Sequence, residues 1–182
     1  MSTSNPNAAK SLDLTKPILV TGASGKTGSK MVAALAKRKA KTRAFIRQEK
    51  TANEVKSLGA NQFALGDFYN DDSLIAAIEG CSCVIHICAP MHPDETDIAR
   101  RITAHCLAAG TGRLILYSVL NSLIQDIPHH HNKLEAERYL INSGQNYTIL
   151  QPSRYMQHLF PIWKNVIETG IHDMPFSVET KF

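Results

Sequence analysis

The sequence lacks the features that mark membrane and secreted proteins. It has no apolar run of about 18 residues, the length that a membrane-spanning helix requires. The polar segment 1–16 has no apolar core and therefore does not resemble a secretory signal. We expect a protein without a membrane segment that works in the reducing cytoplasm.

Cysteine is also scarce, with four residues in a chain of 182. Cys81, Cys83 and Cys88 lie in or beside one apolar run, and Cys106 stands apart. A zinc or redox site is one interpretation, but Cys81 and Cys83 are too close in sequence for the usual ligand pair, and a second pair is absent. We interpret these thiols as small apolar side chains that follow the alternation of a strand.

The composition is that of one globular domain. Hydrophobic residues make up 43% of the chain and charged residues 20%, enough for a sizeable core with an ordinary surface. The net charge of +4 suits an anionic ligand as well as it suits nucleic acid. We expect a flexible N-terminal tail over residues 1–15 and a single domain over 16–182.

Short apolar runs alternate with segments of helical periodicity along the chain. This alternation predicts an α/β, three-layer Rossmann fold, in which a parallel sheet of about six strands is covered by helices on both faces. The expected strands are 17–21, 42–46, 61–65, 83–87, 113–118 and 147–150. The expected helices are 26–39, 51–58, 72–79, 94–109, 131–142 and 156–168.

A glycine-rich segment, TGASGKTG at 21–28, joins the first expected strand to the first expected helix. Gly22 permits a tight turn, Gly25 lets a pyrophosphate approach the backbone, and Gly28 lets the helix pack closely on the strand. The start of the helix offers free N–H groups and a partial positive charge. We predict that this segment binds the diphosphate of a dinucleotide, through Gly22, Ala23, Ser24, Gly25, Lys26, Thr27 and Gly28. A plain turn without a ligand is the alternative.

Acidic residues are absent between Ala23 and Gln48. An NAD-binding unit usually places Asp or Glu about 20 residues beyond the glycines to hold the ribose 2′-hydroxyl. Here Arg47 follows the second strand, and a guanidinium can pair with a 2′-phosphate, with Lys26 adding charge. We therefore predict NADP(H) as the preferred cofactor and NAD(H) as the alternative. The other cations of this stretch fit a solvated helix end: Lys37, Arg38, Lys39 and Lys41.

Three later positions complete the predicted cofactor site at the carboxyl edge of the sheet, where ligands of open parallel sheets bind. Asp67 follows the third strand and is expected near the adenine, and Ala89 follows the fourth and is expected near the ribose. Pro152 and Tyr155 follow the sixth strand and are expected to border the nicotinamide or the substrate. Ordinary loop packing is the alternative for this last pair.

The motifs resemble those of a known family. TGASGKTG resembles the TGxxGxxG turn of extended and atypical short-chain dehydrogenases. KLEAERYL at 133–140 and YTILQPSRYMQ at 147–157 resemble the NmrA-like group. The resemblance covers residues 17–160 and implies a Rossmann fold with strand order 3-2-1-4-5-6 and NAD(P) binding. The chain departs from the group at Gln151, where the motif has Arg, and at His158, where it usually has Asn. Relatives also extend further, so we expect a shortened member that lacks much of the substrate side.

The resemblance also implies catalytic residues. Short-chain dehydrogenases usually use a Ser, a Tyr and a Lys, with the Tyr four residues before the Lys. Lys133 matches, His129 occupies the Tyr position, and Ser118 ends the fifth strand. The lysine can bind the nicotinamide ribose, and an imidazole can donate a proton near neutral pH.

Other interpretations of these residues stay open. For His129 we prefer the interpretation as a loop residue of the polar run 128–131. A metal site of three consecutive histidines is the least favoured alternative. Lys133 also fits a solvated helix residue paired with Glu137.

Three functions follow. The first is NADPH-dependent reduction of a small acceptor such as a quinone or carbonyl, since some members of the group reduce quinones, azo dyes or other small molecules. The second is a regulator that senses NADP(H) and binds a protein partner, which the missing Tyr and the short chain favour. Nucleic-acid binding is the least favoured, because the basic stretch from Lys26 to Arg47 has Phe45 as its lone aromatic residue.

Overall fold

The computed structural model describes residues 12–171, apart from 125 and 154. Most of the predicted N-terminal tail therefore lies outside the described residues. The chain divides into two compact units, one that ends at Gln151 and one that begins at Pro152. A single domain over 16–182 stays a prediction.

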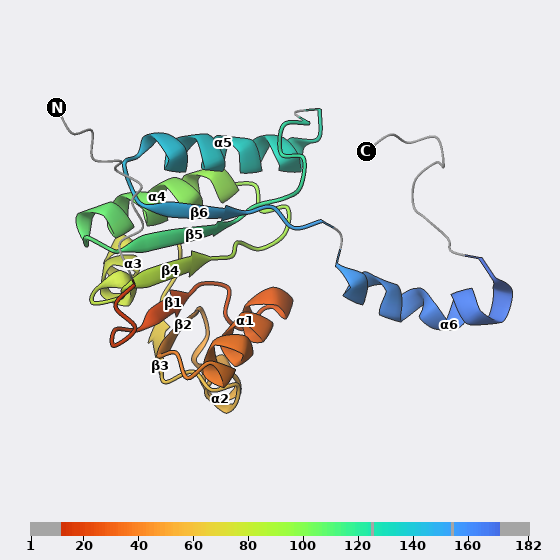
Figure 1. Ribbon diagram of the computed structural model, residues 1–182, viewed down its shortest axis with the longest axis horizontal. Helices are drawn as coiled ribbons and strands as arrows, with labels where there is room; N and C mark the ends of the chain where they lie inside the picture. Colours follow the sequence, from red (N-terminus) through yellow and green to blue (C-terminus); the bar gives the residue numbers. More distant parts are fainter. Residues whose placement is uncertain (1–11, 125, 154, 172–182) are drawn as a thin grey trace. The chain divides into compact units, whose positions relative to one another are not determined.

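The first unit is built on a six-stranded parallel sheet (Figure 1). Its strands are β1 (Ile18–Val20), β2 (Thr42–Ile46), β3 (Gln62–Leu65), β4 (Cys83–His86), β5 (Arg113–Tyr117) and β6 (Tyr147–Leu150). Their order is β3-β2-β1-β4-β5-β6, and every neighbouring pair is parallel. The predicted fold class and strand order are confirmed.

Helices cover both faces of this sheet. They are α1 (Lys26–Lys37), α2 (Ala52–Ser57), α3 (Asp71–Ile78), α4 (Glu95–Ala108) and α5 (Pro128–Asn142), with a short 3-10 turn, η1 (Glu49–Thr51), before α2. Alternate residues of β1 point to opposite faces. Leu19 packs in one core cluster with side chains of α3, α4 and α5, whereas Ile18 and Val20 pack in another with side chains of α1 and α2. The result is the predicted three-layer arrangement.

The fifth helix begins earlier than the sequence pattern suggests. Its expected range was 131–142, with the polar run before it as a loop, but α5 begins at Pro128. Proline suits this first helical position, because its fixed φ is helical and because an N–H at this position would have no partner within the helix. His129 and Lys133 are therefore one helical turn apart on the same face. The interpretation of His129 as a loop residue is wrong.

The cysteines lie in the core. All four are free; Cys81, Cys83 and Cys106 are buried and Cys88 is half-buried. Burial raises the pKa of the Cys83 thiol to about 11 and that of Cys106 to about 12, so both are protonated near neutral pH. Across the described part of the chain, no group of three His, Cys, Asp or Glu side chains could hold a metal ion.

The order of the strands fixes where a ligand site can form. β1 and β4 are neighbours in the sheet but not in the sequence, so the chain turns away in opposite directions on the two sides of this point. Open parallel sheets bind ligands at such a switch point, outside the carboxyl ends of the strands. The segments that follow β1 to β5 all lie along this edge.

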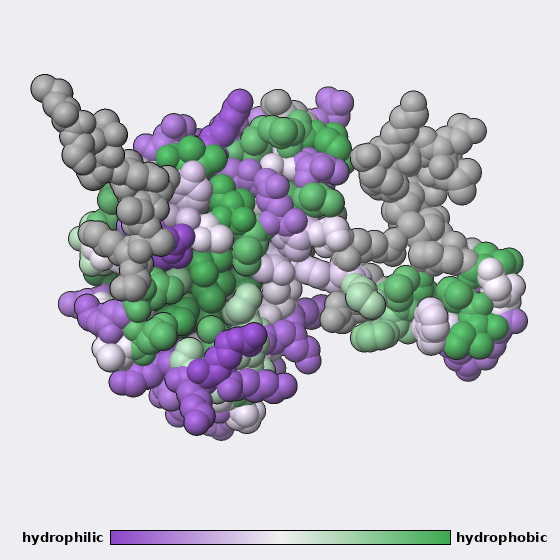
Figure 2. All heavy atoms as spheres, in the orientation of Figure 1, coloured by the Kyte–Doolittle hydropathy of each residue, from purple (hydrophilic) through white to green (hydrophobic). Residues whose placement is uncertain are grey.

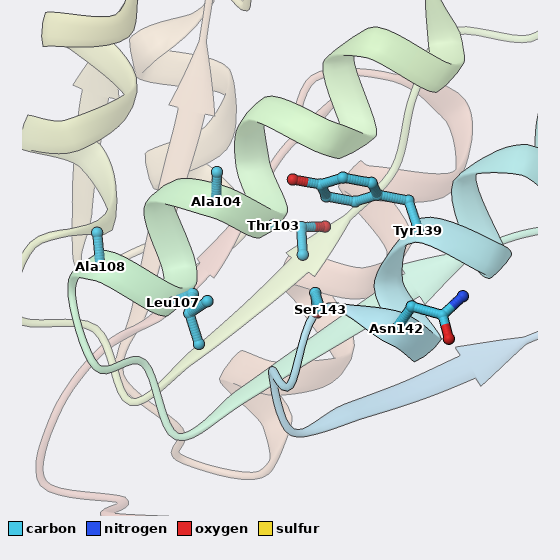
Figure 3. A pocket seen from close by; sticks show the side chains of 7 residues that line it. All are labelled: Thr103, Ala104, Leu107, Ala108, Tyr139, Asn142 and Ser143. Carbon is cyan, nitrogen blue, oxygen red and sulfur yellow. The ribbon is translucent and has the colours of Figure 1, made fainter.

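A surface cavity of about 470 Å³ lies between α4 and α5. Figure 3 shows the Tyr139 ring reaching from α5 toward α4. The cavity is lined by Thr103, Ala104, Leu107, Ala108, Tyr139, Asn142 and Ser143. These residues belong to the ends of helices that lead into β5 and β6, at the amino edge of the sheet. The cavity is therefore remote from the switch-point edge, and we do not assign it to a cofactor.

The described part of the second unit consists of a 3-10 turn, η2 (Met156–Leu159), and the helix α6 (Phe160–Thr169), where one continuous helix was expected. α6 ends at Gly170, which adopts the left-handed conformation. Large apolar side chains are exposed along this unit (Figure 2): Met156, Phe160, Trp163, Ile167 and Ile171. No helix among the described residues is long and apolar enough to cross a bilayer.

Candidate functional site

The glycine turn after β1 is shaped by two close backbone approaches. Gly22 has a φ of +60°, and a Cβ there would lie 2.6 Å from the carbonyl oxygen of Ile87. At Gly28, a Cβ would lie 2.1 Å from the carbonyl oxygen of Gly22. Side chains at these positions would clash with backbone atoms. The tight turn at Gly22 is confirmed, and Gly28 packs closely on that turn, where packing on the strand was expected.

Thr21 ties the turn to the neighbouring strand. Its Oγ1 accepts the N–H of Ile87 at 2.9 Å and lies 2.9 Å from Nδ1 of His86. His86 is fully buried, and burial lowers its pKa to about 3, so the ring is neutral. The carboxyl ends of β1 and β4 are thereby fixed beside each other, which holds the start of α1 in place.

The start of α1 is open to an anion. Gly25 is the N-cap residue, no side chain of the described residues caps the helix, and its first turn contains no acidic residue. The N–H groups of the first helical residues have no partner within the helix. Ser24, Gly25 and Lys26 are exposed, while Ala23 and Gly28 are buried beneath them. The side chains of the turn therefore leave its amide groups uncovered.

Three residues predicted to contact the rest of a dinucleotide follow β2, β3 and β4 along the same edge. Val20 pairs with Ala44 in the sheet, which places Arg47, beyond the end of β2, beside the glycine turn. The Arg47 side chain is exposed. Asp67 follows β3 and accepts the N–H of Tyr69 at 3.0 Å, and Ala89 follows β4 and is exposed. Pro152 and Tyr155 belong to the second unit, so their place at this site stays a prediction.

Lys133 is buried, with 6% of its surface exposed. Its Nζ donates to the carbonyl oxygen of Tyr117 at 2.7 Å and forms an ion pair with Glu95. The interpretation of Lys133 as a solvated residue paired with Glu137 is wrong. An ammonium group has three donors, and two are assigned here, so one is left for a further acceptor.

His129 lies one turn before Lys133. Its Nδ1 is 3.5 Å from a carboxylate oxygen of Glu95, and its side chain is 23% exposed. Burial is the largest cause of a lowered pKa for His129; the Glu95 carboxylate acts in the opposite direction, and Lys133 and His130 add to the lowering. The imidazole is therefore mostly neutral at pH 7 and has an open side toward solvent.

Sequence reasoning missed Glu95. It is the first residue of α4 and is only 2% exposed. An acidic residue at the start of a helix usually interacts with the helix dipole, so its position in the sequence does not indicate a buried functional group. The signal that could have found it is the buried lysine, because a buried cation needs an anionic partner.

Ser118 has a different partner from Lys133 and His129. Its hydroxyl donates to Glu137, which is itself buried and also accepts from Ser122 at 3.1 Å. The side-chain amide of Gln151 donates to both carboxylate oxygens of Glu137, at 2.9 and 3.1 Å. This network joins the ends of β5 and β6 to α5. Ser118 thus serves the network, and the structure does not bring its hydroxyl to His129.

A family model and two known proteins are similar to this chain in sequence. A family model described as NAD(P)H-binding matches residues 22–167. An NAD(P)H azoreductase from Xenophilus azovorans is 28% identical over 160 residues, which is 87% of this chain and 55% of that protein. A 4-hydroxy-2-methyl-3-oxo-4-farnesyl-3,4-dihydroquinoline-1-oxide ketoreductase from Stigmatella aurantiaca is 36% identical over 78 residues, or 43% of this chain and 23% of that protein.

Solved structures share the fold. The Citrobacter sp. triphenylmethane reductase complexed with NADP(H) matches with a TM-score of 0.70 and 23% identity, over 83% of this chain and 55% of that one. An NADPH-dependent quinone oxidoreductase from Escherichia coli complexed with NADPH has a TM-score of 0.71 and 21% identity, over 84% and 54%. The chain thus spans about half the length of these relatives. None of these four is described as a regulator, so the sensing alternative gains no support.

Proposed function

We propose, since this chain belongs to the NAD(P)H-binding family, that it binds NADP(H) at the glycine turn and takes part in the reduction of a small acceptor such as a quinone or carbonyl. The observation that carries the proposal is the uncapped, exposed start of α1 at the switch point of the sheet. Bound NADPH would supply a hydride to the acceptor. The remaining chemistry falls to the residues of the chain.

The residues of the turn fit a diphosphate. The amide groups at the start of α1 and the partial positive charge of the helix favour a doubly charged anion. A Cβ at Gly25 would fill space beside these amides, only 3.1 Å from the carbonyl oxygen of Gly22. Lys26 adds a positive charge at the first helical position. We infer that the phosphates lie against Gly25 and the backbone of residues 26–28.

Arg47 supports a preference for NADP(H) over NAD(H). It follows β2 at the edge where the adenosine ribose of a bound dinucleotide lies in Rossmann domains. A carboxylate there would bind the 2′-hydroxyl of NAD, whereas the guanidinium of Arg47 suits a 2′-phosphate. Asp67 follows β3 and Ala89 follows β4 at the same edge of the sheet. They stay our candidates for the adenine and ribose contacts.

Lys133 and His129 are the candidates for the chemical step. The unassigned donor of Lys133 suits a ribose hydroxyl at the nicotinamide end. Reduction of a quinone or carbonyl oxygen requires a proton as well as a hydride, and His129 has the chemistry to supply it. The similarity to an azoreductase and to a quinone oxidoreductase supports the class of reaction. Placement in the NmrA-like group stays a prediction.

The proposal is tested by mixing the purified protein with NADPH and a panel of quinones, azo dyes and carbonyl compounds, and following the loss of NADPH absorbance. We expect oxidation that depends on the acceptor and saturates with NADPH. Tight NADPH binding without turnover of any acceptor would contradict the proposed reductase activity and would support cofactor binding alone.

Arg47→Ala is expected to weaken NADPH binding about tenfold to a hundredfold, because a charge-assisted contact to the 2′-phosphate is lost. NADH binding should change less than about twofold, since NADH lacks that phosphate. Titrations with both cofactors measure the ratio. Arg38→Ala is the matched control, because it removes the same charge at the far end of α1. Equal losses for NADPH and NADH would contradict the assignment.

A further inference from the structure

We propose that Glu95 is a positioning residue for the reaction, which accepts the Nδ1–H of His129, so that Nε2 carries only the second proton that the ring gives to the acceptor, and which fixes Lys133 beside it. This inference rests on the proposed function for its consequence in turnover, whereas the orientation of the ring can be measured without any turnover.

The geometry places one carboxylate between two functional side chains. Glu95 Oε1 pairs with Nζ of Lys133, and its Oε2 lies 3.5 Å from Nδ1 of His129. Oε2 and Nδ1 are both buried, and neither has a hydrogen-bond partner among the residues that the structure describes. Two unsatisfied polar atoms that face each other at this distance can be joined by a small rotation of the imidazole. A buried polar atom without a partner is costly, which favours that rotation.

The consequence concerns which ring nitrogen carries the proton. A carboxylate at Nδ1 accepts an N–H there, so the neutral ring keeps its proton on Nδ1 and leaves Nε2 free. When the ring takes up a second proton, that proton is on Nε2. During reduction, Nε2 would give this proton to the acceptor oxygen, and bound NADPH would supply the hydride. The ring returns to the neutral Nδ1–H form and is protonated again by water.

Charges on two helices act on the ring. Glu95 on α4 raises the pKa of His129, and Lys133 and His130 on α5 lower it, in addition to the effect of burial. The protonated ring is the proton donor, so turnover should fall as the pH rises through this pKa. Without the Glu95 charge the pKa of His129 falls further. The loss of turnover should then begin at a lower pH.

Glu95→Gln tests the inference, because it keeps the shape of the side chain and removes its charge. We expect a lower His129 pKa in an NMR titration of the imidazole, with the resonance assigned by its absence in His129→Gln. At pH 7 kcat should fall about tenfold and recover toward the wild-type value as the pH is lowered. Asp97→Asn is the control, because it removes an exposed carboxylate from the same helix turn.

An unchanged His129 pKa in Glu95→Gln, or a pH profile of kcat that superimposes on the wild type, would overturn the inference. If that variant does not fold, the ¹⁵N shifts of the His129 ring in the wild type decide. A neutral ring protonated on Nδ1 supports the role of Glu95, and one protonated on Nε2 refutes it. If the protein turns over no acceptor, the proposed function fails, but the ring measurements still report on Glu95.

Discussion

Replacing Gly28 with alanine is expected to lower the free energy of unfolding by about 3 kcal/mol or more. The added Cβ would lie 2.1 Å from the carbonyl oxygen of Gly22 and 2.8 Å from the Cα of Ala23. Both are backbone atoms of the turn that leads out of β1, so no flexible side chain can move aside. Either α1 shifts away from the sheet or the turn is distorted, and both changes disrupt the amide groups at the helix start.

Urea unfolding of the wild type and Gly28→Ala measures the loss. Gly25→Ala is the matched control, since its Cβ would meet the same carbonyl oxygen only at 3.1 Å and its φ of −78° suits any residue. We expect Gly25→Ala to cost about 1 kcal/mol or less. Similar losses for the two variants would mean that helix α1 does not pack on the turn as described.

Replacing Lys133 with methionine is expected to destabilise the protein by about 3–5 kcal/mol. Methionine fills a similar volume, but it leaves the buried Glu95 carboxylate without its cation. The carbonyl oxygen of Tyr117 also loses the donor that lies 2.7 Å away. The loss of stability comes mainly from the unpaired Glu95 carboxylate and not from lost packing.

The double variant Lys133→Met/Glu95→Gln separates these causes. It removes both charges together, so we expect less than about half of the loss seen in Lys133→Met, because replacing a whole buried pair is often close to neutral. Urea unfolding of the single variants and the double variant at pH 7 gives the coupling between the two side chains. Additive losses would show that Lys133 and Glu95 do not depend on each other.

Much of the fold could be predicted because its signals are local. Each strand is a short apolar run, and every expected strand has an observed counterpart that differs by a residue or less at either end. The strand order came from the family resemblance, since periodicity does not say which strands are neighbours. The start of α5 was missed because the run 129–131 is polar, although Pro128 is a typical first residue of a helix.

In the candidate site too, some features could be predicted from the sequence and others could not. The glycine turn is contiguous in sequence, so its roles at Gly22 and Gly28 could be predicted from spacing alone. The pairing of Lys133 with Glu95 could not, because α4 and α5 are joined through β5 and only their packing brings the two side chains together. A local i, i+4 pair of Lys133 with Glu137 was the natural expectation from sequence. Burial overrides it, since both side chains find tertiary partners.

The departure at Gln151 shows how a residue noticed in the sequence acquires a physical meaning. The sequence shows only that a family arginine is replaced. In the structure the Gln151 amide donates to Glu137, alongside the hydroxyls of Ser118 and Ser122. A buried carboxylate is thus held by neutral donors at the ends of β5 and β6. In this arrangement the Ser118 hydroxyl donates to Glu137, and a catalytic role for Ser118 stays a prediction.

Titration of the wild type and Gly25→Val with NADPH, followed by cofactor fluorescence, tests directly whether the turn holds a dinucleotide. The valine should remain compatible with the fold, because Gly25 is exposed and its φ is ordinary, and the urea midpoint checks this. The predicted result is saturable binding by the wild type that Gly25→Val weakens at least about tenfold, because the side chain occupies the space of the phosphates. Equal affinities in the two proteins, or no binding by the wild type, would contradict the assignment of the turn.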